Sequence, residues 1–252
     1  MMNYILADYR RILLRIPRLI FVGLFEIVLA FIVLHKWSGA GANYSSVDFI
    51  SSMDVWLFTL GPIILGVVTL VNVFSDDFKS KTMQVAIGVG VTRFQVVAGK
   101  LIQSFLIFLT DIVLTCVLVT VLSMIVGVQL VPQQIYHLFV EFLYFLLWNT
   151  CWIGIVSILV FKLQGMLLPM LLYIFLNFSV VESLFRWITR SGPELLSRLH
   201  LERYTLEYLL ELFRSNLLME RFNIGAVIGI LIYLGLSLYA TYLVFRKQEL
   251  DF

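Results

Sequence analysis

Apolar residues occur along this chain in long, nearly unbroken runs that are separated by short polar segments. A helix needs about 20 mostly apolar residues to cross the roughly 30 Å hydrocarbon core of a bilayer. Six runs predict membrane-spanning helices, although the first and the fifth are short for that purpose. Their expected bounds are residues 19–34, 55–74, 96–126, 138–161, 166–181 and 224–245. We therefore expect an all-α integral membrane protein in which residues 1–252 form a single domain.

Two segments outside these runs show helical amphipathic patterns. In residues 1–17 the apolar positions are 5, 9, 12, 13 and 16, with basic residues on the other faces. This spacing predicts a basic amphipathic helix in the cytoplasmic interface, or an extension of the first span, and Pro17 favours a break between the two. Residues 182–222 predict an amphipathic element that rests on the outer membrane face or caps the bundle. Its helix is expected to start at Ser191-Gly192-Pro193-Glu194.

Composition supports the membrane assignment. The chain is 61% hydrophobic and 13% charged, with a mean hydropathy of +0.97, whereas soluble domains average about 45–50% apolar and about 25% charged residues. This excludes a soluble enzyme and a free nucleic-acid-binding domain, and a net charge of +2 is too small to indicate a polyanionic partner. The two cysteines lie in apolar runs and the three histidines are far apart, so neither a disulfide framework nor a metal site is expected.

The distribution of basic residues predicts the orientation. An even number of spans places both termini on one side, and the basic residues of the terminal side are Arg10, Arg11, Arg15, Arg18, Lys79, Lys81, Arg93, Lys100, Lys162, Arg246 and Lys247. The two short loops of the opposite side carry only Lys36, while the long third one balances six Arg against six Glu. By the positive-inside rule we expect a multi-pass protein of the cell membrane with both termini in the cytoplasm.

The segment between the second and third expected spans, SDDFKSKTMQVAIGVGVTRFQ (residues 75–95), carries the most information. Two acids and two bases are followed by a short stretch of helical character and by Gly88-Val89-Gly90, which permits a sharp turn. Thr92 can then cap the next helix. The pattern predicts a short helix held crosswise under the bilayer, which suits a mechanical contact with a partner. An ordinary inner loop that obeys the positive-inside rule would have a similar composition.

This segment resembles the cytoplasmic loop of ABC-2 type permeases, the membrane subunits of ATP-binding-cassette exporters. The matching positions are Asp77, Lys81-Thr82, Gly90-Val91-Thr92-Arg93 and Gly99-Lys100. The layout of an N-terminal interfacial helix, six spans and an outer amphipathic segment is also similar to that family, above all to its compact peptide- or bacteriocin-immunity members. The sequence departs from the family at Lys79 and Lys81, where acidic residues usually precede the Thr.

The resemblance implies that residues 76–90 form a coupling helix seated in a separate ATPase subunit. The residues expected to contact that subunit are Asp76, Asp77, Lys79, Lys81, Thr82, Gln84, Gly88, Gly90 and Arg93. The chain has no G-x-x-x-x-G-K-[ST] motif, so ATP and Mg are expected on the partner and not on this non-catalytic chain. A second permease copy or a homologous permease, surrounded by membrane lipid, would complete an exporter of lipophilic or amphipathic cargo such as an antimicrobial peptide.

Three acidic residues lie within the expected spans: Glu26, Asp111 and Glu141. Ionisable groups in a bilayer are expensive and often functional, so these residues are candidates for a transport path. They would face a cavity, or pair with Arg or Lys that reach in from an end. Interhelical packing through hydrogen bonds would also account for them. They further support an alternative function, a stand-alone ion-coupled transporter or channel with an acidic relay. A membrane-embedded enzyme is a third alternative, although HExxH and GxSxG signatures are absent.

Overall fold

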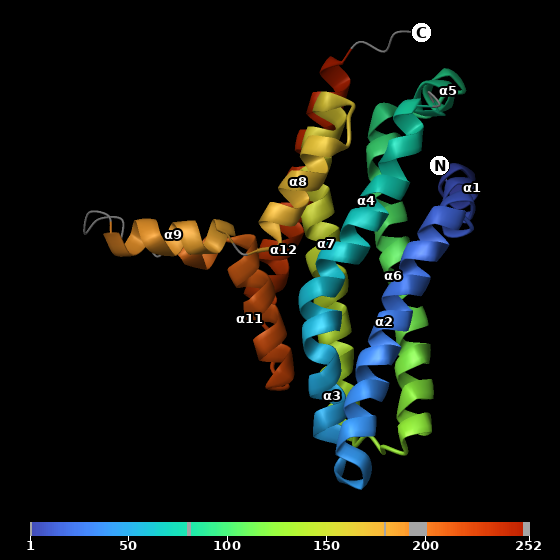
Figure 1. The fold of residues 1–252 in the computed structure, drawn as a ribbon. Coiled ribbons are helices and arrows are strands. Elements are labelled where there is room, and N and C mark those ends of the chain that lie inside the picture. Colours follow the sequence, from blue (N-terminus) through green and yellow to red (C-terminus); the bar gives the residue numbers. More distant parts are fainter. Residues whose placement is uncertain (1, 80–81, 179, 192–200, 249–252) are drawn as a thin grey trace.

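The computed structural model describes residues 2–79, 82–178, 180–191 and 201–248. These residues form helices, and no strand occurs among them (Figure 1). In chain order the helices and helical turns are α1 (Met2–Leu13), α2 (Ile16–Ala40), η1 (Gly41–Asn43), α3 (Ser46–Asp54), η2 (Val55–Leu60), α4 (Gly61–Lys79), α5 (Thr82–Gly88), α6 (Arg93–Val126), α7 (Pro132–Leu163), α8 (Leu167–Leu176), α9 (Val180–Ser191), η3 (Leu201–Tyr204), α11 (Leu206–Leu218) and α12 (Ile224–Lys247).

Among the described residues, five helices are long and apolar enough to cross a membrane, which is consistent with an all-α protein of the multi-pass membrane type. They are Ile16–Ala40, Ser46–Ser75, Arg93–Val126, Pro132–Leu163 and Ile224–Lys247. The first is longer than the sequence predicted, because helical structure continues beyond the apolar run at both ends. The second is formed by α3, η2 and α4 in succession.

The predicted fifth span, residues 166–181, does not form as one helix. Only Leu167–Leu176 is an apolar helix, and ten residues at about 1.5 Å each reach roughly 15 Å, half the thickness of a bilayer core. The chain breaks at Asn177, whose side-chain amide donates to the Tyr173 carbonyl (2.8 Å) and whose Oδ1 accepts from the Trp148 indole (2.8 Å). These bonds fix the end of α8 beside the middle of α7.

The chain then continues in two differently oriented helices. Figure 1 shows α9 leaving the bundle sideways, across the direction of the long helices. The predicted start of an outer helix at residues 191–194 falls almost wholly outside the described residues. Thr205 instead caps α11, which runs along the half of α7 that α8 does not reach, where Tyr136 donates to the Leu217 carbonyl (2.7 Å). Together α8 and α11 cover the length that one span was expected to cover.

The first helix and the end of the last helix lie at one end of the bundle. Figure 1 places α1, α5 and the C-terminal end of α12 at the same end of the bundle. The predicted break before Pro17 is confirmed, because α1 ends at Leu13 and α2 begins at Ile16. The apolar face of α1 packs on the bundle, where Ile5 and Ile12 are buried in the core.

The second span contains a π-helical turn. The turn η2 lies immediately before Gly61 and Pro62, and a proline cannot donate the backbone hydrogen bond that a regular helix requires. A π turn accommodates one more residue than an α-helical turn. Within η2, Trp56 stacks on Phe25 at a centroid distance of 5.3 Å and its indole donates to the Phe25 carbonyl (3.2 Å).

Beyond the π turn, α4 makes a close contact with α8. Tyr173 is fully buried, and its hydroxyl lies 2.9 Å from the Pro62 carbonyl oxygen and also contacts the Asn149 side chain. This approach requires the absence of a side chain at Gly66, because a Cβ there would collide with the Tyr173 hydroxyl. The tyrosine thereby joins α4, α7 and α8.

We expect Gly66→Ala to lower the free energy of unfolding by about 1–3 kcal/mol, because the new methyl group displaces Tyr173 from its site. Thermal unfolding can be followed with a thiol-reactive dye that reports exposure of Cys151, which is buried, in a Cys116→Ala background. Gly235→Ala is the matched control, since no atom lies within 4 Å of a Cβ at that position. Equal melting temperatures for the two variants would contradict the tight contact at Gly66.

Candidate functional site

The segment that joins α4 to α6 contains a short helix and a glycine turn, as its sequence predicts, but the short helix does not span residues 76–90: α4 continues through Asp76 and Asp77 to Lys79, and α5 begins at Thr82. The helix α5 ends at Gly88, and Gly90 adopts a φ of +99°, a conformation that side chains strongly disfavour. Thr92 then caps α6: its hydroxyl accepts from the Gln95 amide (3.2 Å), and the Gln95 side chain accepts from the Thr92 amide (2.9 Å). The reciprocal bonds fix the direction in which the chain enters α6.

One side of α5 is apolar and exposed. Met83 is buried and Ile87 packs against the core, whereas Val85 and Val89 are 62% and 82% exposed. Residues four apart lie on the same face of a helix, so these two valines form one small apolar surface at the end of the bundle. Sequence reasoning emphasised the charged residues of this segment and missed the valines, although their spacing was the available signal.

The structure describes only some of the residues that were predicted to contact the ATPase. Lys81 lies outside the described residues, as do the side chains of Asp76, Asp77, Lys79, Thr82 and Gln84, whose backbones belong to α4 and α5. Gly88 and Gly90 form the end of α5 and the turn. Arg93 contacts the end of α12 instead of projecting with α5.

Arg93 caps the C-terminal end of α12. Its Nη1 donates to the carbonyls of Phe245 (2.8 Å), Arg246 (2.7 Å) and Gln248 (3.0 Å), and the guanidinium lies 5.6 Å from the centre of the Phe245 ring. The last carbonyls of a helix have no partner within the helix and carry partial negative charge, so a cation stabilises them. The α5–α6 turn is thus attached to the last helix as well as to α4 and α6.

Lys100 is buried in the bundle. Its Nζ lies 2.6 Å from Asp8 Oδ2 and donates to the Val73 carbonyl (3.1 Å). Asp8 also forms an ion pair with Arg11 at 2.5 Å. The contact attaches α1 to α6 through a charge that the sequence had assigned to membrane topology and to the resemblance with the permease loop.

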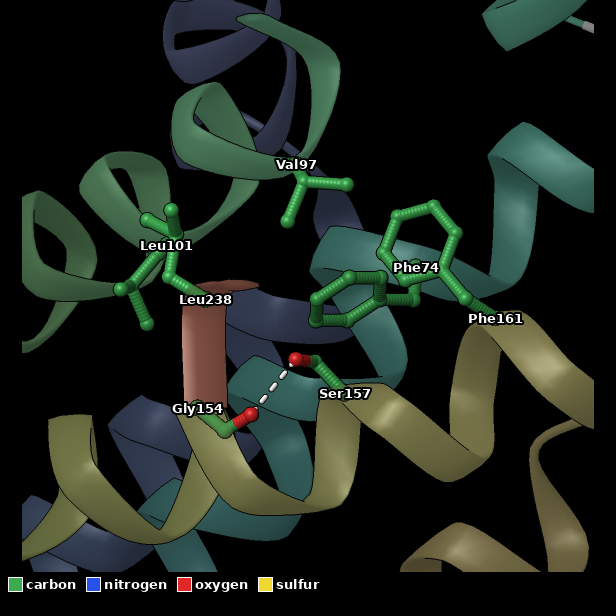
Figure 2. Close-up of a pocket in the computed structure, with 7 residues that line it drawn as sticks. All are labelled: Phe74, Val97, Leu101, Gly154, Ser157, Phe161 and Leu238. Carbon is green, nitrogen blue, oxygen red and sulfur yellow. Dashed lines mark hydrogen bonds between the residues drawn. The ribbon is translucent and has the colours of Figure 1, made fainter. Parts of the chain in front are cut away.

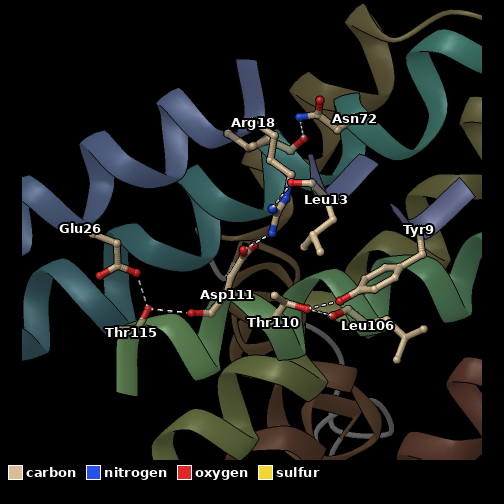
Figure 3. Close-up of polar contacts among 10 residues, drawn as sticks. Tyr9, Leu13, Arg18, Glu26, Asn72, Leu106, Thr110, Asp111 and Thr115 are labelled. Carbon is tan, nitrogen blue, oxygen red and sulfur yellow. Dashed lines mark hydrogen bonds and ion pairs between the residues drawn. The ribbon is translucent and has the colours of Figure 1, made fainter. Parts of the chain in front are cut away.

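Asp111 forms an ion pair with Arg18, and both side chains are 1% exposed (Figure 3). Arg18 also donates to the Leu13 carbonyl (3.3 Å) at the corner between α1 and α2. Of the arrangements considered for the intramembrane acids, pairing with a basic residue from another helix end is the one found for Asp111. Removing either partner alone destabilises the folded protein, because the remaining charge is buried without a counter-charge.

Glu26 lies next to this pair. Its Oε1 is 2.6 Å from the Thr115 hydroxyl, which is also 2.9 Å from the Asp111 backbone carbonyl (Figure 3). One residue before Asp111 on α6, the hydroxyls of Thr110 and Tyr9 are 2.6 Å apart. Arg18, Glu26, Asp111 and Thr115 are called the α2–α6 polar cluster below.

Glu141 belongs to a different site. The Arg214 Nε lies 2.8 Å from each Glu141 oxygen, and Arg214 Nη1 lies 3.0 Å from Glu211. The guanidinium also lies 5.3 Å from the centre of the Tyr144 ring. Glu141 thus attaches α11 to α7, and the structure brings together Glu26 and Asp111 but not all three predicted acids.

Two hollows differ greatly in size. A cavity of about 10 Å³ lies among α4, α6, α7 and α12 (Figure 2), room for about one water molecule. Its lining residues are Phe74, Val97, Leu101, Gly154, Ser157, Phe161 and Leu238. A second, mostly apolar groove of about 540 Å³ lies between the later part of α6, including Cys116 and Ser123, and the first half of α7, including Leu138 and Phe142.

Comparison with known proteins found no matching family model and no matching curated protein. Within the described part of the chain, no group of three or more His, Cys, Asp or Glu side chains lies close enough to hold a metal ion.

We expect Arg18→Met to lower the free energy of unfolding by about 3–5 kcal/mol, because it leaves the Asp111 carboxylate buried without a counter-charge. The double variant Arg18→Met/Asp111→Leu is expected to be more stable than either single variant, since it removes both charges. The melting temperatures of the three variants are compared by following the exposure of Cys151 to the thiol-reactive dye. Arg10→Met, at an exposed position, is the control; an effect as large as that of Arg18→Met would contradict a specific role for the pair.

Proposed function

We propose that this chain is the membrane permease subunit of an ATP-driven ABC-2 type exporter. The observation that carries the proposal is the short helix α5, which connects two candidate spans directly and presents the exposed side chains of Val85 and Val89 at the end of the bundle. A partner that binds there can move α4 and α6 together. The permease itself is not an enzyme in this proposal, and ATP and Mg are bound by a separate ATP-binding-cassette subunit.

The contacts around α5 support a mechanical role. A displacement of α5 reaches α12 through Arg93, and it reaches α1 and α2 through the ion pairs of Lys100 and Asp111 with Asp8 and Arg18. These contacts are charged and largely buried, so they resist separation more strongly than single apolar contacts do. A push on one short helix is therefore transmitted to four of the five candidate spans.

The orientation and the assembly complete the proposal. With α5 in the cytoplasm, both termini are cytoplasmic, because α1 and the end of α12 lie at the same end of the bundle (Figure 1). A second copy of the chain or a homologous permease provides the other half of the translocation path. A six-traverse topology is retained if α8 and α11 together make the fifth crossing.

The groove between α6 and α7 supports an amphipathic or lipophilic cargo. It is mostly apolar, its volume of about 540 Å³ lies within the range of small-molecule sites, and Thr120 and Ser123 provide polar groups on one wall. Membrane lipid or the apolar part of a small antimicrobial peptide fits this chemistry.

An ion-coupled transporter or channel remains the second candidate, because Glu26 and Asp111 share Thr115 within the bundle. A relay through all three acids has no support from Glu141, which pairs with Arg214. Transport that persists without ATP in proteoliposomes, driven by a proton gradient alone, would favour this second candidate.

Val85→Asp is expected to reduce recovery of an ATP-binding-cassette ATPase with the tagged chain by at least about tenfold, equivalent to about 1.4 kcal/mol of binding free energy. The reason is that binding of the partner would bury the new carboxylate in an apolar contact, which is energetically costly. Mass spectrometry of the purified complex measures the recovery. Leu163→Asp, which places the same charge at an exposed position that ends α7, is the matched control. Undiminished recovery with Val85→Asp would contradict α5 as the contact.

A labelling experiment tests the orientation. In a chain that lacks Cys116 and Cys151, Val89→Cys is expected to react with a membrane-impermeant thiol reagent only after the cells are permeabilised, because α5 faces the cytoplasm. Gln129→Cys, in the exposed turn between α6 and α7 at the opposite end, is expected to react in intact cells. The reverse pattern would place α5 outside the cell, where no ATPase can bind it.

A further inference from the structure

The Thr115 hydroxyl has two oxygen neighbours within hydrogen-bond distance but only one hydrogen to donate. The Thr115 hydroxyl oxygen lies 2.6 Å from Glu26 Oε1 and 2.9 Å from the Asp111 backbone oxygen (Figure 3). Both distances are normal for complete O–H···O hydrogen bonds. A hydroxyl donates a single hydrogen, and a backbone carbonyl only accepts. If Thr115 donates to the carbonyl of its own helix, the hydrogen in the other bond must come from Glu26.

The second oxygen of Glu26 leads to the same conclusion. Among the described residues, Glu26 Oε2 is buried and has no hydrogen-bond partner. An ionised carboxylate accepts several hydrogen bonds and is costly to bury when they are missing, whereas a neutral carboxylic acid needs far less. The nearby guanidinium does not supply the missing charge, since Arg18 Nη2 is engaged with Asp111 Oδ1.

We propose that Glu26 is a proton-binding site of the folded protein: its carboxyl group is protonated and donates its hydrogen to the Thr115 hydroxyl, which in turn donates to the Asp111 carbonyl. The inference does not depend on the proposed exporter function, because it concerns only the charge state of the α2–α6 polar cluster. In that state the cluster contains one anion, Asp111, and one cation, Arg18, and it is neutral.

The surroundings determine what release of the proton would require. The titratable groups that face Glu26 are Asp111 and Cys116 of α6, which both interact electrostatically with it, and the cation of the cluster is Arg18. Tyr9 of α1 bonds to Thr110, and Arg15, which precedes α2, bonds to Asn72 of α4, while η2 contributes the neutral Trp56. Ionised Glu26 would put two carboxylates beside one guanidinium. Proton release therefore requires α2 and α6 to separate or a small cation to enter.

Infrared spectroscopy of the purified full-length protein in lipid tests the assignment. We expect a carboxylic-acid C=O stretching band at neutral pH that is lost in Glu26→Gln. In Thr115→Val the band should persist at higher frequency, because the acid loses its hydrogen-bond acceptor. Glu141→Gln, which alters a buried but ion-paired carboxylate, is the matched control and should leave the band unchanged.

The outcomes are distinguishable without relying on any single variant. Absence of the band from the wild-type protein at neutral pH would overturn the proposal, and so would a band that persists in Glu26→Gln. A band that is unshifted in folded Thr115→Val would also overturn the donor assignment. Circular dichroism of each variant establishes that the helices are retained, and a shift of the wild-type band on transfer to deuterated buffer identifies it as an exchangeable acid.

Discussion

Two buried ion pairs join the N-terminal helices to α6, and much of the architecture depends on them. Lys100 and Asp111 are eleven residues apart, which places them about 16 Å apart along α6. Their partners, Asp8 and Arg18, lie on either side of the break between α1 and α2. Both arms of this corner are therefore attached to one helix. An amphipathic helix held only by its apolar face could slide along the surface, whereas a helix paired with a buried lysine has a defined position.

The local features of the α5 region could be predicted from the sequence because their causes are local. Gly90 permits a positive φ by itself, and Thr92 and Gln95 cap a helix through neighbours three residues apart. Five of the six apolar runs likewise lie in long helices of the described residues. The break at Asn177 was missed because one polar residue is outweighed by its apolar neighbours in the mean hydropathy of a run, while the bond to the Trp148 indole depends on which helix lies next to α8.

The pairing of charges could not be predicted for the same reason. Positive residues near span ends were assigned to membrane orientation. Acids within spans were expected to face a cavity, to pair with an unspecified Arg or Lys from a span end, or to serve in packing, so the partner of each acid was left open. Only the arrangement of the helices shows that Lys100 and Arg18 neutralise acids from distant segments, and that Arg214 of α11 neutralises Glu141. The useful signal in the sequence was the isolated acid in an otherwise apolar run. Such an acid needs a basic or hydrogen-bonding partner from elsewhere in the chain.

The π turn η2 makes the number of residues in the second span a determinant of the fold. One residue of an α-helix corresponds to about 100° of rotation, so the additional residue turns everything before it relative to everything after it. With this rotation, Phe49 and Met53 of α3 point into the core while Gly66 of α4 faces Tyr173. A helix of the same composition but one residue shorter would direct one of these two faces toward lipid. The register between the two halves of this span is thus encoded by length rather than by the identity of any side chain.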